Sequence, residues 1–176
     1  MGWKKLKEHY KIGHIVQVTS KGVCIGSPYI HDFIVIANGT PKWSNPRRVS
    51  SNDDLARYFA EMNSDLSKLQ ELIDAPDEFE NSITVYSYDG ATIIEKKCEK
   101  LGWPNITHDG EIMHDNLFSE DHDVTLKRAL EYAQSGVKHF GDRVAKIQED
   151  LKNQKKLFQE SQYQVASLEK EIAEST

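Results

Sequence analysis

The chain has 176 residues, 38% hydrophobic and 28% charged, with a formal net charge of −6. This length fits one compact domain with an extension, or two small domains. No apolar run approaches the roughly 20 residues of a membrane span, no secretory segment follows Met1, and the two distant cysteines do not suggest a disulfide framework, so we expect a soluble protein of the cytoplasm.

The first part of the chain predicts a short helix and then an antiparallel sheet. Residues 3–10 fit a short helix. Residues 14–26 and 29–39 are rich in β-branched and aromatic residues. The turn signals Ser-Lys-Gly, within the first range, and Ser-Pro, between the two ranges, divide them, which favours two or three strands. Residues 39–53 hold two prolines and several small polar residues, so we expect a connecting loop there.

A single helix is predicted next, from Ser51 to Ile73. Asp53 and Asp54 would lie in its first turn, where the helix dipole favours negative charge. Apolar residues then follow at alternating steps of four and three until Pro76 ends the run.

Residues 81–101 predict a strand, a tight turn and a helix. The stretch SITVYSYDG alternates as a strand does, and Thr92 and Glu95 have the spacing of a helix capping box. We expect this helix to end at Leu101, with Gly102 left-handed and Trp103 folded back on the core.

The C-terminal segment carries the strongest pattern. From Leu126 to Ile172, apolar residues recur at alternating steps of four and three, and twelve of the fourteen positions are apolar. Seven such heptads are typical of a coiled coil. The fold class is therefore α+β: a globular domain at residues 1–121, made of a small antiparallel sheet with helices, followed by a coiled-coil helix at residues 122–176.

This helix is too long for its own domain to cover. From Asp123 to Ala173 it would extend about 75 Å, whereas a domain of ~120 residues has a radius of gyration of about 14 Å. We therefore expect a parallel homodimer, with β-branched residues at most a positions. The alternative is a helix folded within its own subunit, bent at Gly136 or Gly141. The predicted oligomerisation residues are Leu126, Leu130, Val137, Phe140, Val144, Ile147, Leu151, Phe158, Val165, Leu168 and Ile172.

Charge is unevenly distributed and suggests two further surfaces. Residues 51–80 hold two basic residues against nine acidic ones, and residues 1–50 hold eight against two. The acidic block could meet a basic nucleic-acid channel on a protein partner. Its residues are Asp53, Asp54, Glu61, Asp65, Glu71, Asp74, Asp77, Glu78 and Glu80. The basic block could bind nucleic acid, although we expect it mainly to neutralise the acids of its own fold. Its residues are Lys4, Lys5, Lys7, Lys11, Arg47 and Arg48.

Histidines and acids cluster within residues 108–123. Imidazole and carboxylate groups together can bind a transition metal or act as a general base, so a metal-dependent enzyme is an alternative hypothesis. The spacing matches no established metal or catalytic motif. The same residues also fit an Asp-Gly turn followed by an acidic first helical turn. No catalytic residue, metal or cofactor is therefore assigned. The residues concerned are His108, Asp109, His114, Asp115, His122 and Asp123.

The run from Cys98 to Gly110 resembles a family of small bacteriophage and prophage proteins. Those proteins share a Cys-Glu-x-Leu-Gly-Trp-Pro-Asn-x-Thr-His-Asp-Gly core before a helical tail, and the resemblance covers about residues 83–119. It implies a virus-encoded accessory protein acting in the cytoplasm of a bacterial host. Because such proteins often occupy a surface of a host machine, our leading hypothesis is a non-enzymatic, dimeric inhibitor of a bacterial defence system such as CRISPR-Cas.

Overall fold

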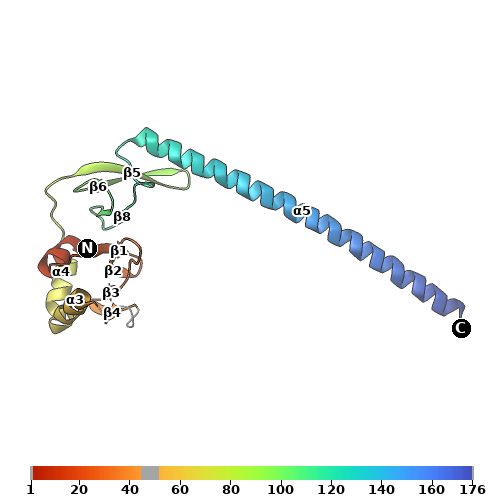
Figure 1. The fold of residues 1–176 in the computed structure, drawn as a ribbon, viewed down its shortest axis with the longest axis horizontal. Coiled ribbons are helices and arrows are strands. Elements are labelled where there is room, and N and C mark those ends of the chain that lie inside the picture. Colours follow the sequence, from red (N-terminus) through yellow and green to blue (C-terminus); the bar gives the residue numbers. More distant parts are fainter. Residues whose placement is uncertain (1, 45–51, 176) are drawn as a thin grey trace. The chain divides into compact units, whose positions relative to one another are not determined.

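The computed structural model describes residues 2–44 and 52–175, and it divides the chain into two compact units, residues 1–127 and 128–176. The first unit is α+β, with antiparallel sheets and short helices, and the helix that closes the chain is long (Figure 1). The predicted fold class is confirmed. Among the described residues, no helix has the length and apolarity needed to cross a membrane.

The predicted short N-terminal helix is present, and a four-stranded sheet follows it. Helix α1 spans Trp3–His9. The strands are β1 (Ile15–Thr19), β2 (Gly22–Gly26), β3 (Ile34–Ala37) and β4 (Thr40–Trp43), paired antiparallel in that order. We predicted two or three strands and assigned β4 to a loop because of its proline. An edge strand tolerates Pro41, since one side of it needs no ladder hydrogen bonds.

Two helices replace the single helix predicted from Ser51 to Ile73. Helix α3 spans Asp53–Ser64 and α4 spans Leu66–Asp74. The break is at Asp65, whose side chain accepts a hydrogen bond from the Lys68 N–H and so begins a new helix. Asn52 caps α3 by accepting from the Leu55 N–H at 3.0 Å, while Ser51 lies outside the described residues.

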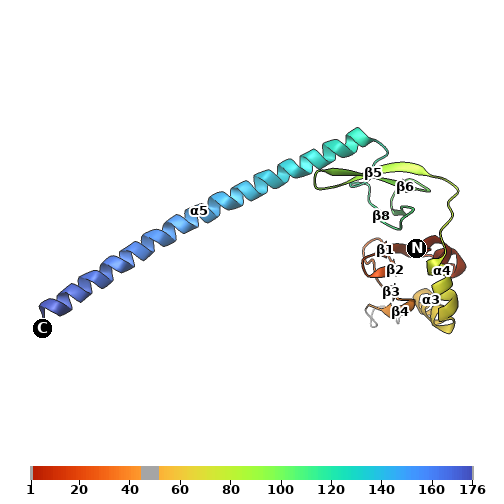
Figure 2. The ribbon, with the colours of Figure 1, turned by 180° about the vertical axis from the view of Figure 1, so that it is seen from behind.

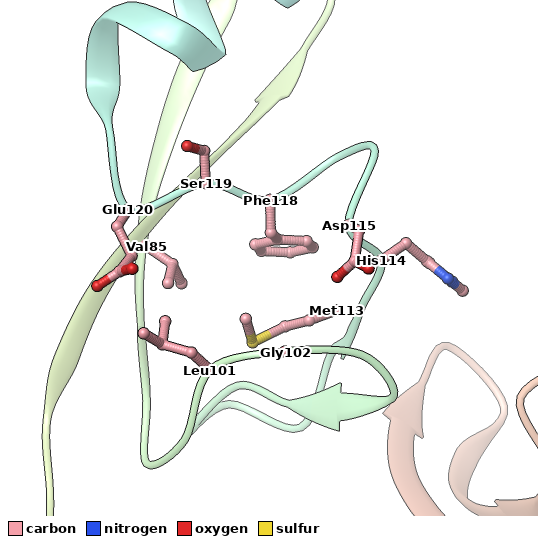
Figure 3. A pocket seen from close by; sticks show the side chains of 9 residues that line it. All are labelled: Val85, Leu101, Gly102, Met113, His114, Asp115, Phe118, Ser119 and Glu120. Atoms are coloured by element: carbon pink, nitrogen blue, oxygen red, sulfur yellow. The ribbon is translucent and has the colours of Figure 1, made fainter.

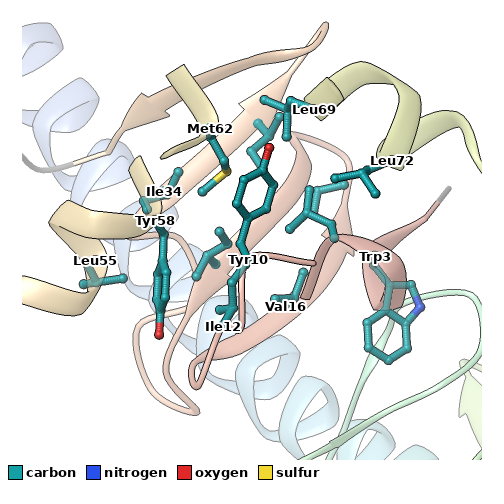
Figure 4. Close-up of a cluster of buried hydrophobic side chains, with 14 of the residues drawn as sticks. Trp3, Tyr10, Ile12, Val16, Ile34, Leu55, Tyr58, Met62, Leu69 and Leu72 are labelled. Carbon is teal, nitrogen blue, oxygen red and sulfur yellow. The ribbon is translucent and has the colours of Figure 1, made fainter. Parts of the chain in front are cut away.

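The main core lies between α1, α3, α4 and the four-stranded sheet. Figure 4 shows side chains from all of these helices meeting those of the strands. Its fully buried members include Leu6, Val16, Ile34, Tyr58, Met62 and Leu69. The hydroxyl of Tyr58 also accepts a hydrogen bond from the Gly13 N–H at 2.9 Å, so the phenol is not left unsatisfied in the core.

A β-hairpin occupies residues 83–98, where we had predicted a strand and then a helix. Strand β5 (Ile83–Asp89) pairs along its whole length with β6 (Thr92–Cys98). The helix prediction from Thr92 to Leu101 is wrong, because pairing of all seven residues with β5 outweighs the local capping-box signal. Gly102 does have a positive φ, 95°, but it follows a strand and not a helix.

The segment after this hairpin joins the two parts of the first unit. Strands β7 (Asn105–Ile106) and β8 (Ile112–Met113) form a small hairpin of their own. Ile112 packs in the main core, whereas its neighbour Met113 packs in a second cluster with Val85, Cys98 and Phe118. Successive residues of one strand thus serve two cores, as expected from the alternation of side chains.

The last helix, α5, spans His122–Glu174, close to the predicted limits of Asp123 and Ala173. Its 53 residues correspond to about 80 Å. Asp121 caps it, since its carboxylate accepts from the N–H groups of Asp123 and Val124 at 2.8 and 3.2 Å. Figures 1 and 2 show α5 as one uninterrupted helix, so Gly136 and Gly141 do not break it.

Candidate functional site

The apolar stripe of α5 is the first candidate site. Its large side chains are 50–77% exposed, in contrast to the core residues of the first unit. A continuous apolar surface of this size marks an interaction surface in a soluble protein. The stripe consists of Leu126, Leu130, Val137, Phe140, Val144, Ile147, Leu151, Phe158, Val165, Leu168 and Ile172, all within one helix.

Two polar residues interrupt the stripe at d positions. Ser161 is satisfied within the helix, because its hydroxyl donates to the carbonyl oxygen of Leu157 at 3.0 Å. Gln154 would face its own copy in a parallel, in-register pair, where two amides can hydrogen-bond to each other. In a pair shifted by one heptad, Gln154 would face Ile147 or Ser161, so this residue favours a single register.

The charged residues that flank the stripe do not repel one another in a parallel pair. In a parallel pair, the g position Asp150 of one copy lies beside the e position Lys155 of the other, and the remaining g–e pairs contain no like charges. Ion pairs on the opposite helix face, Lys156–Glu160 at 3.8 Å and Lys170–Glu174 at 3.7 Å, keep that face polar. The helix is therefore amphipathic along its length.

The histidines and acids of residues 108–123 do not converge. His108 stacks on Phe79 with ring centroids 3.8 Å apart, His114 accepts a hydrogen bond from Trp103, and His122 packs edge-on against Tyr86. Within residues 2–44 and 52–175, no three His, Cys, Asp or Glu side chains could hold one metal ion. The arrangement gives no geometric support to the metal-enzyme alternative.

Asp109 has a structural role in the same segment. Its carboxylate pairs with Lys96 at 2.6 Å and accepts a hydrogen bond from the Thr107 hydroxyl. Burial alone would raise the pKa of Asp109, but these hydrogen bonds lower it below its usual value. Asp109 therefore stays charged and ties the β7–β8 turn to β6.

Most side chains of the predicted acidic surface contact other residues of the first unit. Six of the nine side chains have an internal contact: Glu61 with Arg57, Asp65 with the Lys68 N–H, Glu71 with Lys68, Asp74 with Gln70, Asp77 with the N–H groups of Lys4 and Lys5, and Glu78 with Lys5. Asp53 and Asp54 occupy the first turn of α3, and the backbone N–H of Glu80 donates to Glu99. These contacts leave fewer unpaired carboxylates for a nucleic-acid-mimicking surface than the sequence suggested.

Two lysines of the basic block also make ion pairs within the fold. Lys4 pairs with Glu99 at 2.7 Å and Lys5 with Glu78 at 3.2 Å, so these two lysines neutralise acids of their own fold. Burial lowers the pKa of Lys7, and Lys11 has a positive φ of 50° at the end of α1. Arg47 and Arg48 lie outside the described residues.

Replacing Glu99 with glutamine should make the protein less stable at neutral pH but not in acid. Hydrogen bonds from Lys4 and from the Glu80 N–H lower the pKa of Glu99. The unfolded carboxyl, with a pKa of 4.5, binds a proton first as pH falls, so this stabilisation is complete above pH 4.5 and is lost as pH falls through the lowered folded value. Urea unfolding of Glu99→Gln should show a loss of about 0.5–1 kcal/mol at pH 7 that shrinks as the pH falls below 4.5.

The matched control for this change is Glu95→Gln. Glu95 lies on β6, four residues before Glu99, and pairs with Lys97, but both of these side chains are largely exposed. We expect its stability to change by less than about 0.5 kcal/mol at either pH. An equal loss at pH 7 and pH ~3 in Glu99→Gln would contradict the assigned role of its charge.

A pocket beside the second hydrophobic cluster is the second candidate site. Its volume is about 230 Å³, and it is lined by Val85, Leu101, Gly102, Met113, His114, Asp115, Phe118, Ser119 and Glu120. Figure 3 shows the apolar side chains of Leu101, Val85, Met113 and Phe118 grouped together, with Glu120 and Asp115 on either side and His114 pointing away. This pocket was not predicted from the sequence: the paired apolar residues Ile112-Met113 and Leu117-Phe118 in a loop-like segment indicate buried side chains there, but not a pocket.

Trp103 lies next to the pocket and not in the core, contrary to our prediction. It is 38% exposed, and its indole N–H donates to Nδ1 of His114 at 2.8 Å. Tyr29, which is 83% exposed, contacts the Trp103 ring edge-on, and His31 stacks on His114. Tyr29 and His31 come from the loop between β2 and β3, whereas His114 follows β8. We call Tyr29, His31, Trp103 and His114 the aromatic rim.

Comparison with protein-family models, with curated proteins and with solved structures finds no match to this chain.

Proposed function

We propose that this chain is a non-enzymatic binding protein that works as a parallel dimer joined through α5. The observation that carries the proposal is the exposed apolar stripe, sustained over seven heptads of one continuous helix. Each large aliphatic or aromatic side chain removed from water contributes about 1.5–3 kcal/mol, so covering eleven of them on each copy gives a large driving force for pairing. A second copy matches the stripe in period, length and flanking charge.

The parallel orientation can be tested with a single new cysteine. Ser161→Cys places a thiol at a d position, where a parallel, in-register dimer brings the two copies face to face. Under mild oxidation we expect most of the protein to become a covalent dimer on a non-reducing gel. Cys24 and Cys98 are both buried and should not interfere.

Ser167→Cys is the control for this crosslink, because it adds the same thiol at an outward c position of the next heptad. Little covalent dimer should form from it. Equal crosslinking of the two variants, or none in either, would contradict the parallel arrangement.

We further propose that the dimer acts in a bacterial host as a bacteriophage-encoded inhibitor of a defence complex such as CRISPR-Cas. This part rests on the resemblance of Cys98–Gly110 to phage accessory proteins. Expression of the full chain in cells with an active CRISPR-Cas system should restore plaque formation by a targeted phage, and a dimer-breaking variant should restore less. Unchanged restriction across representative system types would contradict this role.

A further inference from the structure

The pocket of the first unit combines an apolar floor with acidic sides. Val85, Met113 and Phe118 are 1–6% exposed and form the floor, while Leu101 is 44% exposed at the edge. A volume of about 230 Å³ suits one bulky aliphatic side chain with room for its neighbours. Small, mostly apolar concavities with a few convergent polar groups are the usual form of a ligand site.

Negative charge surrounds this floor. Asp115 and Glu120 are exposed and lie on different sides of the apolar group in Figure 3. Burial raises the pKa of the Cys98 thiol and the charge of Glu120 raises it further, which places this carboxylate near the second cluster. Asp115 and Glu120 are the two charged residues that line the pocket, so its sides favour a cation.

The aromatic rim adds an exposed aromatic contact surface beside the pocket. The hydrogen bond from Trp103 to His114 fixes the indole, and the tyrosine ring of Tyr29 is held against it. Exposed, preorganised Trp and Tyr side chains are enriched among the residues that dominate binding energy in protein interfaces. Their ring faces also attract guanidinium groups.

We propose that this pocket docks a segment of a partner protein in which a bulky aliphatic residue is flanked by arginines. The aliphatic side chain would cover the floor, and the two guanidinium groups would reach Asp115 and Glu120 in charge-assisted hydrogen bonds. A nucleic acid does not fit this chemistry, because the two carboxylates repel phosphate. The inference rests on the proposed binding function and names the chemistry of the partner.

The test uses the full chain and three short peptides, observed by the shift of the Trp103 indole N–H signal in NMR spectra. The probe acetyl-Ser-Arg-Leu-Arg-Ser-amide should bind with a dissociation constant of about 0.1–1 mM, as expected for a small, flexible ligand. Replacing its leucine with glycine, or both arginines with glutamate, should weaken binding at least tenfold. A response to the glutamate or glycine peptide equal to that of the probe, or no response to the probe at ~5 mM, would overturn the proposal.

A matched pair of variants locates the binding on the protein. Asp115→Asn with Glu120→Gln keeps the shape of both side chains and should weaken probe binding roughly tenfold or more. Glu149→Gln with Glu160→Gln removes the same charge from α5 and should leave the affinity unchanged. Equal weakening of probe binding by both double substitutions would show that only the net charge of the protein matters, and would overturn the proposed site.

Failure of peptide binding can be distinguished from failure of dimerisation. Probe binding should persist in a variant whose α5 no longer pairs. An intact chain that is monomeric in solution but still binds the probe would contradict only the proposed self-association. If the Asp115→Asn, Glu120→Gln variant instead loses its dimeric mass, the occupant is a second copy of this chain and the proposed partner is wrong.

Discussion

Ile147→Asp combined with Leu151→Asp should convert the protein from a dimer to a monomer. The two residues occupy adjacent layers, one d and one a, and they are 56% and 53% exposed in the single chain. In the dimer these layers contain four large aliphatic side chains, each contributing about 1.5–3 kcal/mol. Their loss alone costs at least about 6 kcal/mol, or about four orders of magnitude in the dissociation constant. Sedimentation velocity at micromolar concentration should show one species of half the mass.

A second readout of the same variant is helicity. A long helix without a partner is stabilised only by its own backbone hydrogen bonds and side-chain pairs, so the monomer should lose helical circular dichroism on modest heating. The control is Ala145→Asp with Asn153→Asp, which adds the same two charges at b and c positions of the same helix. This control should remain dimeric. A monomeric control, or a dimeric Ile147→Asp, Leu151→Asp variant, would contradict the assigned face.

Gly110→Ala should destabilise the first unit by about 3 kcal/mol or more. Gly110 has a φ of 92°, and an added Cβ would lie 2.3 Å from Cγ2 of Val18. Its carbonyl also accepts a hydrogen bond from the Val18 N–H at 2.8 Å, which ties the β7–β8 turn to β1. The left-handed conformation costs an alanine about 1–2 kcal/mol. Because the added Cβ also forces the β7–β8 turn away from β1, the loss of this hydrogen bond and of packing adds to that cost.

Gly90→Ala is the matched comparison for this change. Gly90 also has a positive φ, 57°, but an added Cβ meets no described atom within 4 Å. It should therefore cost only about 1–2 kcal/mol. All three tryptophans, Trp3, Trp43 and Trp103, lie in the first unit, so urea unfolding followed by their fluorescence reports this unit directly. Equal destabilisation by the two substitutions would show that the contact with Val18 does not stabilise the unit.

The long helix was predictable because its signal is both local and repeated. Every heptad from Leu126 to Ile172 supports the same face, so two polar residues and two glycines do not obscure the pattern. The acidic start of this helix was predictable for the same reason, since acids near a helix N-terminus stabilise its free N–H groups. These features need only neighbouring residues.

The errors occurred where distant residues decide the structure. Thr92 and Glu95 carry a four-residue helix signal, but pairing with β5 places both in a strand. Asp65 sits within an apolar periodicity that continues across it, yet its side chain caps a new helix. The pocket unites Val85, Leu101, Met113 and Glu120 from separate segments, and no short pattern in the sequence specifies that they meet.

The mass of the intact chain in solution tests directly whether α5 pairs two copies. One copy has a mass of 20.1 kDa, so multi-angle light scattering at micromolar concentration should give about 40 kDa, twice that value. A stable species of 20.1 kDa across the same concentration range would show that the stripe of α5 does not pair two copies.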